Sequence, residues 1–142
     1  MPPVFVLDTS VIIKWFRQGE VLAKQALALR TAYLEGEITI TVPALLAYEL
    51  TNVLRYKGDL TTAQVEEAVQ SLFGMALNWA PPSATMMRRA VTIAREYEVT
   101  VYDATFIAVA ESLGAVFVTA DEQLARKLAP LSFVRFLGEE VE

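Results

Sequence analysis

Four carboxylates stand at positions where proteins that alternate strands and helices carry out chemistry. Asp8 directly follows a short run of apolar residues that we interpret as a buried strand, and Asp121 follows a second such run. Asp103 opens a nearly all-apolar stretch typical of a deeply buried helix, and Glu49 lies at the edge of the inward face of another predicted helix. In open α/β sheets, ligands bind beyond the carboxyl ends of the strands. We therefore expect the four carboxylates to meet at one edge of a sheet.

Each acid has an ordinary structural role as an alternative. Asp8, Asp103 and Asp121 all stand where an N-cap is expected, which stabilises a helix by about 1 kcal/mol, and Glu49 could simply reach water. Four clustered carboxylates without counterions would repel one another, however, and some would have to stay protonated. A divalent cation relieves that repulsion, and Mg²⁺ leaves coordination positions for water and phosphate oxygens. Two such ions, about 3.5–4 Å apart, can stabilise the attacking and leaving oxygens of phosphodiester hydrolysis.

The residue types that are missing exclude several kinds of site. The chain has no Cys and no His, which excludes disulfides, thiolate metal sites, a Cys nucleophile and a Ser-His-Asp triad. Catalysis must use carboxylates, hydroxyls, Lys, Arg or Tyr, or a metal bound by oxygen, and oxygen ligands favour Mg²⁺ and Mn²⁺. The net charge of −5 argues against non-specific binding of duplex nucleic acid, although bound cations can reverse the local sign.

Length and composition predict one folded domain over residues 1–142. Hydrophobic residues make up 54% of the chain and charged residues 20%, which excludes disorder. The mean hydropathy of +0.38 suits a sheet covered on both faces or a subunit interface. No apolar run reaches the ~20 residues that a membrane span needs, and no basic segment precedes the first apolar run, so we expect a cytoplasmic protein.

Apolar periodicity and turn residues predict strands that alternate with helices. This alternation indicates a three-layer α/β/α fold with a mostly parallel central sheet. The two helices in the middle of the chain should form a helical hairpin inserted between strands, and the last residues, 138–142, an acidic solvated tail. The predicted strands are 4–7, 38–42, 77–80, 116–119 and 133–137. The predicted helices are 11–16, 21–35, 43–57, 61–73, 83–97, 103–113 and 121–130.

Taken together, four short motifs resemble the PIN-domain family, and more narrowly the VapC-type toxins of type II toxin–antitoxin systems. They are VLDTS at 6–10, a Glu at 49 in a helix after a proline, YDA at 102–104 and VTAD at 118–121. The resemblance covers essentially the whole chain, in the expected order.

This resemblance implies an endoribonuclease that depends on Mg²⁺ or Mn²⁺, is inhibited by a cognate antitoxin and forms a homodimer. On this basis we expect water activated by the bound metal to attack the phosphorus of the RNA in line, with the 3′ oxygen as the leaving group. Ser10 and Thr119 match the family's supporting hydroxyls, which would orient the carboxylates. The acidic quartet, carried over as catalytic and metal-binding residues, is Asp8, Glu49, Asp103 and Asp121.

Other functions remain open at this point. A haloacid-dehalogenase-like phosphatase needs a second acid two residues after Asp8, where this chain has Ser10, and a receiver domain needs an acidic pair after the first strand. A PIN-type nuclease of RNA processing and an inactive PIN-like interaction module are the remaining alternatives. Surplus apolar residues in the Trp15-Phe16 pair and in the predicted helices 21–35 and 43–73 are either core or a dimer face with a groove for an antitoxin helix. Basic residues that could contact phosphates, or be ordinary solvated charges, are Lys14, Arg17, Arg88 and Arg89.

Overall fold

The fold is built on one five-stranded sheet, and the computed structural model describes residues 1–139. The strand order is β3-β2-β1-β4-β5, and every pairing is parallel. Strand β1 therefore lies at the centre, with β2 and β4 on either side. The strands are β1 (Val4–Leu7), β2 (Thr39–Pro43), β3 (Asn78–Ala80), β4 (Val116–Thr119) and β5 (Val134–Phe136).

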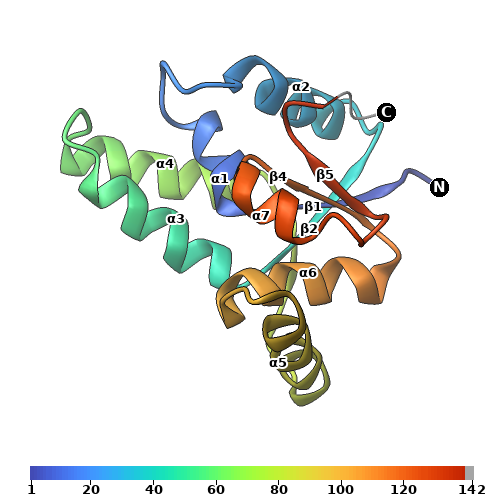
Figure 1. The fold of residues 1–142 in the computed structure, drawn as a ribbon. Coiled ribbons are helices and arrows are strands. Elements are labelled where there is room, and N and C mark those ends of the chain that lie inside the picture. Colours follow the sequence, from blue (N-terminus) through green and yellow to red (C-terminus); the bar gives the residue numbers. More distant parts are fainter. Residues whose placement is uncertain (140–142) are drawn as a thin grey trace.

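Helices lie on both sides of this sheet, which confirms the predicted α/β/α layers (Figure 1). Helix α6 packs against β1, β2 and β4, and α5 packs on α6. On the opposite side lies α2, which contacts η1. The helices are α1 (Thr9–Ile12), the 3-10 helix η1 (Ile13–Trp15), α2 (Ala23–Leu34), α3 (Leu45–Tyr56), α4 (Thr62–Gly74), α5 (Ala84–Tyr97), α6 (Val101–Leu113) and α7 (Glu122–Lys127).

Helix α6 is the most deeply buried helix because the sheet lies on one side of it and α5 on the other. Its residues 104–110 are all buried, which matches the apolar run that the sequence shows there. Burial on both sides also explains why this helix lacks the polar stripe of a surface helix. The N-terminal turn of α6 is thereby held in a fixed position relative to the ends of β1 and β4.

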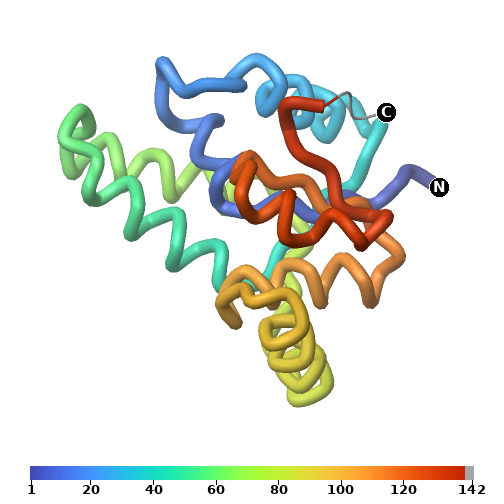
Figure 2. Tube along the Cα trace, in the orientation of Figure 1, coloured from blue at the N-terminus to red at the C-terminus, as the bar shows by residue number. Residues whose placement is uncertain are grey.

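Helices α3 and α4 form the predicted helical hairpin, which projects to one side of the sheet (Figure 2). The turn between them ends in a capping box, in which the Thr61 side chain accepts a hydrogen bond from the backbone of Gln64 while the Gln64 side chain accepts one from the backbone of Thr61. Leu46, Leu50 and Leu54 face inward along α3. This spacing leaves Glu49 at the boundary between the buried and exposed faces.

Several element boundaries differ from the prediction by one to three residues. Pro43 ends β2 rather than opening the next helix, because the parallel ladder continues through the N–H of Ala44, which donates to the carbonyl of Ala80 at 3.0 Å. The first helix spans Thr9–Ile12 and tightens into a 3-10 turn before residue 16. Helix α6 begins at Val101, two residues before the predicted start at Asp103.

Within residues 1–139, no helix is long and apolar enough to cross a bilayer.

Trp15, which the sequence left open between core and interface, is buried, and its indole N–H donates to the carbonyl of Ala26 at 2.8 Å. Most of the predicted acidic tail, residues 140–142, lies outside the described residues.

Candidate functional site

Asp8 is the buried acid at the carboxyl end of the central strand. Its side chain is 6% exposed, and two hydroxyl groups donate to it, Ser10 Oγ to Oδ1 and Thr119 Oγ1 to Oδ2, each at 2.5 Å. Strands β1 and β4 are neighbours, so the end of β4 delivers Thr119 to the acid. The same hydroxyl oxygens accept backbone hydrogen bonds, Ser10 from Ala120 at 2.8 Å and Thr119 from Asp121 at 3.1 Å.

The carboxylate of Asp8 makes no capping hydrogen bond, although Asp8 occupies the N-cap position of α1. Helix α6 is likewise capped by the Thr100 side chain, which accepts from the N–H of Asp103 at 3.0 Å, and Asp103 lies in the first turn. Among the three candidate N-caps, only Asp121 accepts a capping hydrogen bond, from the N–H of Leu124 at 3.1 Å. Helix capping therefore explains the position of only one of the three aspartates, Asp121.

Glu49 reaches the site from helix α3. Its half-buried carboxylate accepts a hydrogen bond from Thr9 Oγ1 at 2.8 Å. Thr9 is the first residue of α1, directly after Asp8, so this bond brings the edge of α3 to the end of β1. The sequence singled out Ser10 and Thr119 as supporting hydroxyls and missed Thr9.

Asp103 and Asp121 lie together at the other side of the site. Both line a small hollow of about 130 Å³ between the N-terminus of α6 and helix α7. Lys127 also lines this hollow, and its ammonium group donates to the carbonyl of Glu98 at 2.9 Å. Lys127 is a cation near the acids that the sequence reading missed, because a lysine near the end of a short surface helix has no pattern that marks it.

Burial raises the pKa values of three of the four acids, and the charge of a neighbouring acid adds to each rise. Burial, partly offset by the Ser10 and Thr119 hydrogen bonds, raises the pKa of Asp8 to about 7, and the nearby charge of Asp103 adds to the rise. Burial is the main cause that raises the pKa of Glu49, and the charge of Asp103 raises it further. Burial is likewise the main cause that raises the pKa of Asp103, and the charge of Asp121 raises it further. Asp103 is therefore the charge that links the other three.

The donors suit a hard cation, although they do not form a ready ligand set. Among residues 1–139, no three acidic side chains lie close enough together to hold a metal ion as they are placed. The donors available are carboxylate oxygens, the ligands that Mg²⁺ and Mn²⁺ prefer. A nearby cation would also reverse the effect of burial and mutual repulsion, because it favours the charged form of each acid. That the four acids share a cation stays a prediction.

Comparison with models of protein families decides where this chain belongs. The PIN domain model matches residues 5–128, from β1 through α7. The chain belongs to the PIN-domain family. Comparison with curated protein sequences finds no match.

Solved structures share the fold of this PIN domain at low sequence identity. A toxin–antitoxin complex from Klebsiella pneumoniae contains a chain that is 20% identical, with a TM-score of 0.69 over 95% of this chain and 98% of that one. PAE2754 from Pyrobaculum aerophilum is 21% identical, with a TM-score of 0.69 over 96% and 92%. VapC20 from Mycobacterium tuberculosis, described as a Sarcin-Ricin loop cleaving toxin, is 14% identical, with a TM-score of 0.68 over 89% and 95%.

Ion pairs engage most of the basic residues that the sequence offered for phosphate contacts. Lys14 and Arg17 both pair with Glu20, and Arg89 makes two hydrogen bonds to Glu111, at 2.6 and 2.9 Å. None of the three lines the hollow that contains Asp103 and Asp121. Lys127, by contrast, lines this hollow together with the two acids.

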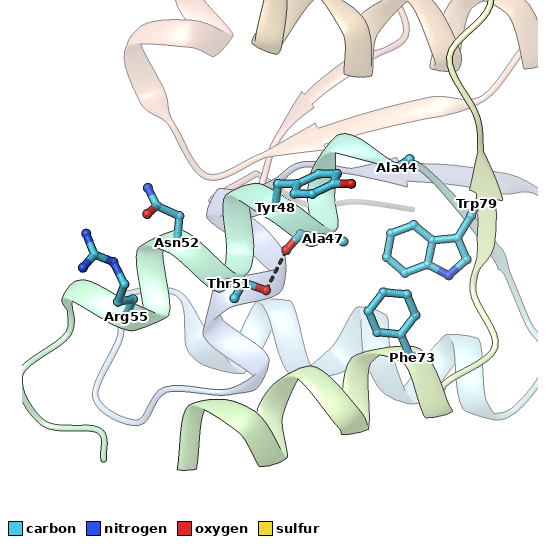
Figure 3. A pocket seen from close by; sticks show the side chains of 8 residues that line it. All are labelled: Ala44, Ala47, Tyr48, Thr51, Asn52, Arg55, Phe73 and Trp79. Atoms are coloured by element: carbon cyan, nitrogen blue, oxygen red, sulfur yellow. Dashed lines mark hydrogen bonds between the residues drawn. The ribbon is translucent and has the colours of Figure 1, made fainter. Parts of the chain in front are cut away.

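A separate, larger hollow lies beside α3, between that helix, the C-terminal end of α4 and strand β3 (Figure 3). It has a volume of about 650 Å³ and does not include any of the four acids. Phe73 and Trp79 form one wall and stack on each other with ring centroids 5.1 Å apart. Tyr48 and Arg55 project from α3 along the other wall (Figure 3). We call this hollow the hairpin groove; its lining residues are Ala44, Ala47, Tyr48, Thr51, Asn52, Arg55, Phe73 and Trp79.

Proposed function

We propose that this PIN domain is an endoribonuclease that depends on Mg²⁺ or Mn²⁺ and acts as the VapC-type toxin of a toxin–antitoxin pair. The observation that carries the proposal is the burial of Asp8, whose carboxylate caps no helix and has its pKa raised to about 7. A buried, charged carboxylate lowers the free energy of unfolding unless a nearby cation compensates its charge. The described cleaving activity of VapC20, a protein of the same fold, supports the choice of RNA as substrate.

The residues that would hold the cation are Asp8, Glu49, Asp103 and Asp121. A bound divalent ion lowers the pKa of water and stabilises charge on a phosphate, which replaces the missing His base. Ser10 and Thr119 hold both oxygens of Asp8 in place through their 2.5 Å hydrogen bonds. Lys127 offers a cation for the phosphate on the side of Asp103 and Asp121.

An inactive interaction module is the main alternative, and it explains the site less well. Such a module would use the acids as helix caps, but neither Asp8 nor Asp103 caps a helix with its side chain. A module without a cation would also gain stability by replacing Asp8 with an apolar residue. The arrangement therefore favours the nuclease.

Removal of metal gives the direct test of this function. With a single-stranded RNA of mixed sequence, we expect the purified protein to cleave internally in Mn²⁺ and to lose that cleavage in EDTA. Added Mn²⁺ should restore it, because the site has no His or Cys to act without a metal. Cleavage that continues unchanged after complete chelation would contradict the proposal.

The hairpin groove is the place we propose for the antitoxin. The groove is mostly apolar, and exposed aromatic side chains such as Tyr48 (76%) and Phe73 (53%) border it. An amphipathic helix of a partner buries such a surface well, and Arg55 at one end offers a charge for an acidic residue on that helix. The presence of an antitoxin in the Klebsiella pneumoniae complex supports this choice of partner. We retain a homodimer in the proposal because exposed apolar side chains remain outside the groove, among them Leu27 and Leu34 on α2.

Charge in the groove should weaken the antitoxin complex while nuclease activity remains. We expect Phe73→Asp to reduce co-purification with the product of the adjacent gene at least tenfold, because an unpaired charge would be buried against the apolar helix. Val91→Asp, an equally exposed apolar position outside the groove, is the matched control. Equal loss in both variants would contradict the placement. Lack of any small DNA-binding protein encoded beside the gene would favour an RNA-processing nuclease over a toxin.

A further inference from the structure

Glu49 is held by one hydroxyl that the family resemblance did not point to. Thr9 Oγ1 donates to Glu49 Oε1 at 2.8 Å, across 40 positions of sequence. Within residues 1–139, this is the only hydrogen bond that the Glu49 side chain makes. By contrast, two hydroxyls hold Asp8. The position of the Glu49 carboxylate therefore depends on Thr9 alone.

The place of Thr9 in its helix explains why its hydroxyl is available. Thr51 and Thr105 lie inside helices, and each donates to the carbonyl four residues before it. Thr9 is the first residue of α1 and has no such carbonyl within its helix. Its hydroxyl can therefore turn toward α3 and donate to Glu49 instead. Two consecutive residues of the short helix α1 thus donate to different acids, Thr9 to Glu49 and Ser10 to Asp8.

A half-buried glutamate has several rotamers, and holding one of them costs entropy. The Thr9 hydrogen bond occupies Oε1 and leaves Oε2 without a partner among the described residues. We propose that Thr9 is a positioning residue, which holds one carboxylate oxygen of Glu49 and leaves the other for a divalent cation that the acids would share. This inference rests on the proposed function, because it assigns Thr9 a role in holding the cation of that site.

Binding of Mn²⁺ alone, measured by isothermal titration calorimetry, tests this role without an activity assay. Thr9→Val keeps the shape of the side chain and removes the hydroxyl, so we expect the Kd for Mn²⁺ to rise about tenfold, the usual effect of losing a supporting hydrogen bond. Thr9→Ser keeps the hydroxyl and should bind within about twofold of the wild type. Thr92→Val removes a hydroxyl that donates only to a carbonyl of its own helix, that of Arg88, and is the matched control. Thr9→Ala replaces Thr9→Val if that variant does not fold.

A double-mutant cycle separates positioning of Glu49 from a general effect on the fold. In a Glu49→Gln background, Thr9→Val should cause no further rise in Kd, because the group that Thr9 positions has already lost its charge. An equal rise in both backgrounds, or wild-type Mn²⁺ affinity in Thr9→Val, would overturn the inference while the proposed function stands. Absence of Mn²⁺ binding by the wild-type protein would overturn both. Lower thermal stability with unchanged affinity would make Thr9 only a structural link between α1 and α3 and would overturn its positioning role.

Discussion

Replacing Asp8 with Asn is expected to reduce Mn²⁺-dependent cleavage of RNA by about a thousandfold or more. A loss of that size corresponds to about 4 kcal/mol of transition-state stabilisation. Asn keeps the size of the side chain but removes the negative charge at the centre of the site. The amide also cannot accept hydrogen bonds on both sides, so either Ser10 or Thr119 must reorient.

The measurement is the initial rate of cleavage of a labelled RNA at saturating Mn²⁺. Asp59→Asn is the matched control, because Asp59 is exposed, lies in the turn between α3 and α4 and pairs with Arg17 rather than with any of the four acids. We expect this control to cleave at the wild-type rate. Circular dichroism should show that both variants keep the fold. An Asp8→Asn protein with full activity would remove Asp8 from the catalytic site.

In the absence of metal, the free energy of unfolding is expected to fall as the pH rises. Burial raises the pKa of Asp8 from 3.8 to about 7, so the folded state holds a proton that the unfolded chain has already released. The free energy of unfolding should therefore be highest at low pH, fall between about pH 4 and pH 7, and level off above pH 7. For Asp8 alone the loss between pH 5 and pH 8 is about 3 kcal/mol. The raised pKa values of Glu49 and Asp103 act in the same direction.

Urea denaturation in EDTA at pH 5 and pH 8 measures this dependence. Asp8→Asn cannot ionise at this position, so its free energy of unfolding should change much less between the two pH values. At pH 8 the metal-free variant should be more stable than the metal-free wild type, while Mn²⁺ should stabilise only the wild type strongly. A wild-type protein whose metal-free stability is flat or rises over this range would contradict the raised pKa of Asp8.

The elements that place the acids were predictable because each rests on local pattern. The apolar run at 104–110 indicated a helix buried on both sides, and the structure buries every one of those residues. The apolar stretches before Asp8 and Asp121 indicated two buried strands of a parallel sheet, and the structure adds that these strands, β1 and β4, are paired. A parallel sheet then brings the ends of these strands to one edge. The sequence thus predicted which segments meet.

Contacts between side chains were less predictable because they depend on packing between distant segments. The bond from Thr9 to Glu49 joins two helices whose relative position no local pattern reveals. Lys127 approaches Asp103 only because α7 folds back across the N-terminus of α6. The capping of α6 by Thr100 was missed because Asp103 is also a good N-cap residue, and the choice between them is set by where the chain leaves α5.

We propose that acids from the ends of β1 and β4 and from helices α3 and α6 share a divalent cation. A crystal of the wild-type protein soaked in Mn²⁺, with anomalous diffraction recorded at the manganese edge, tests this claim directly. We predict an anomalous peak about 2.1 Å from carboxylate oxygens of Asp8 and at least one of Glu49, Asp103 and Asp121. Saturating Mn²⁺ with no peak among these side chains, or with its only peaks elsewhere on the surface, would contradict the account.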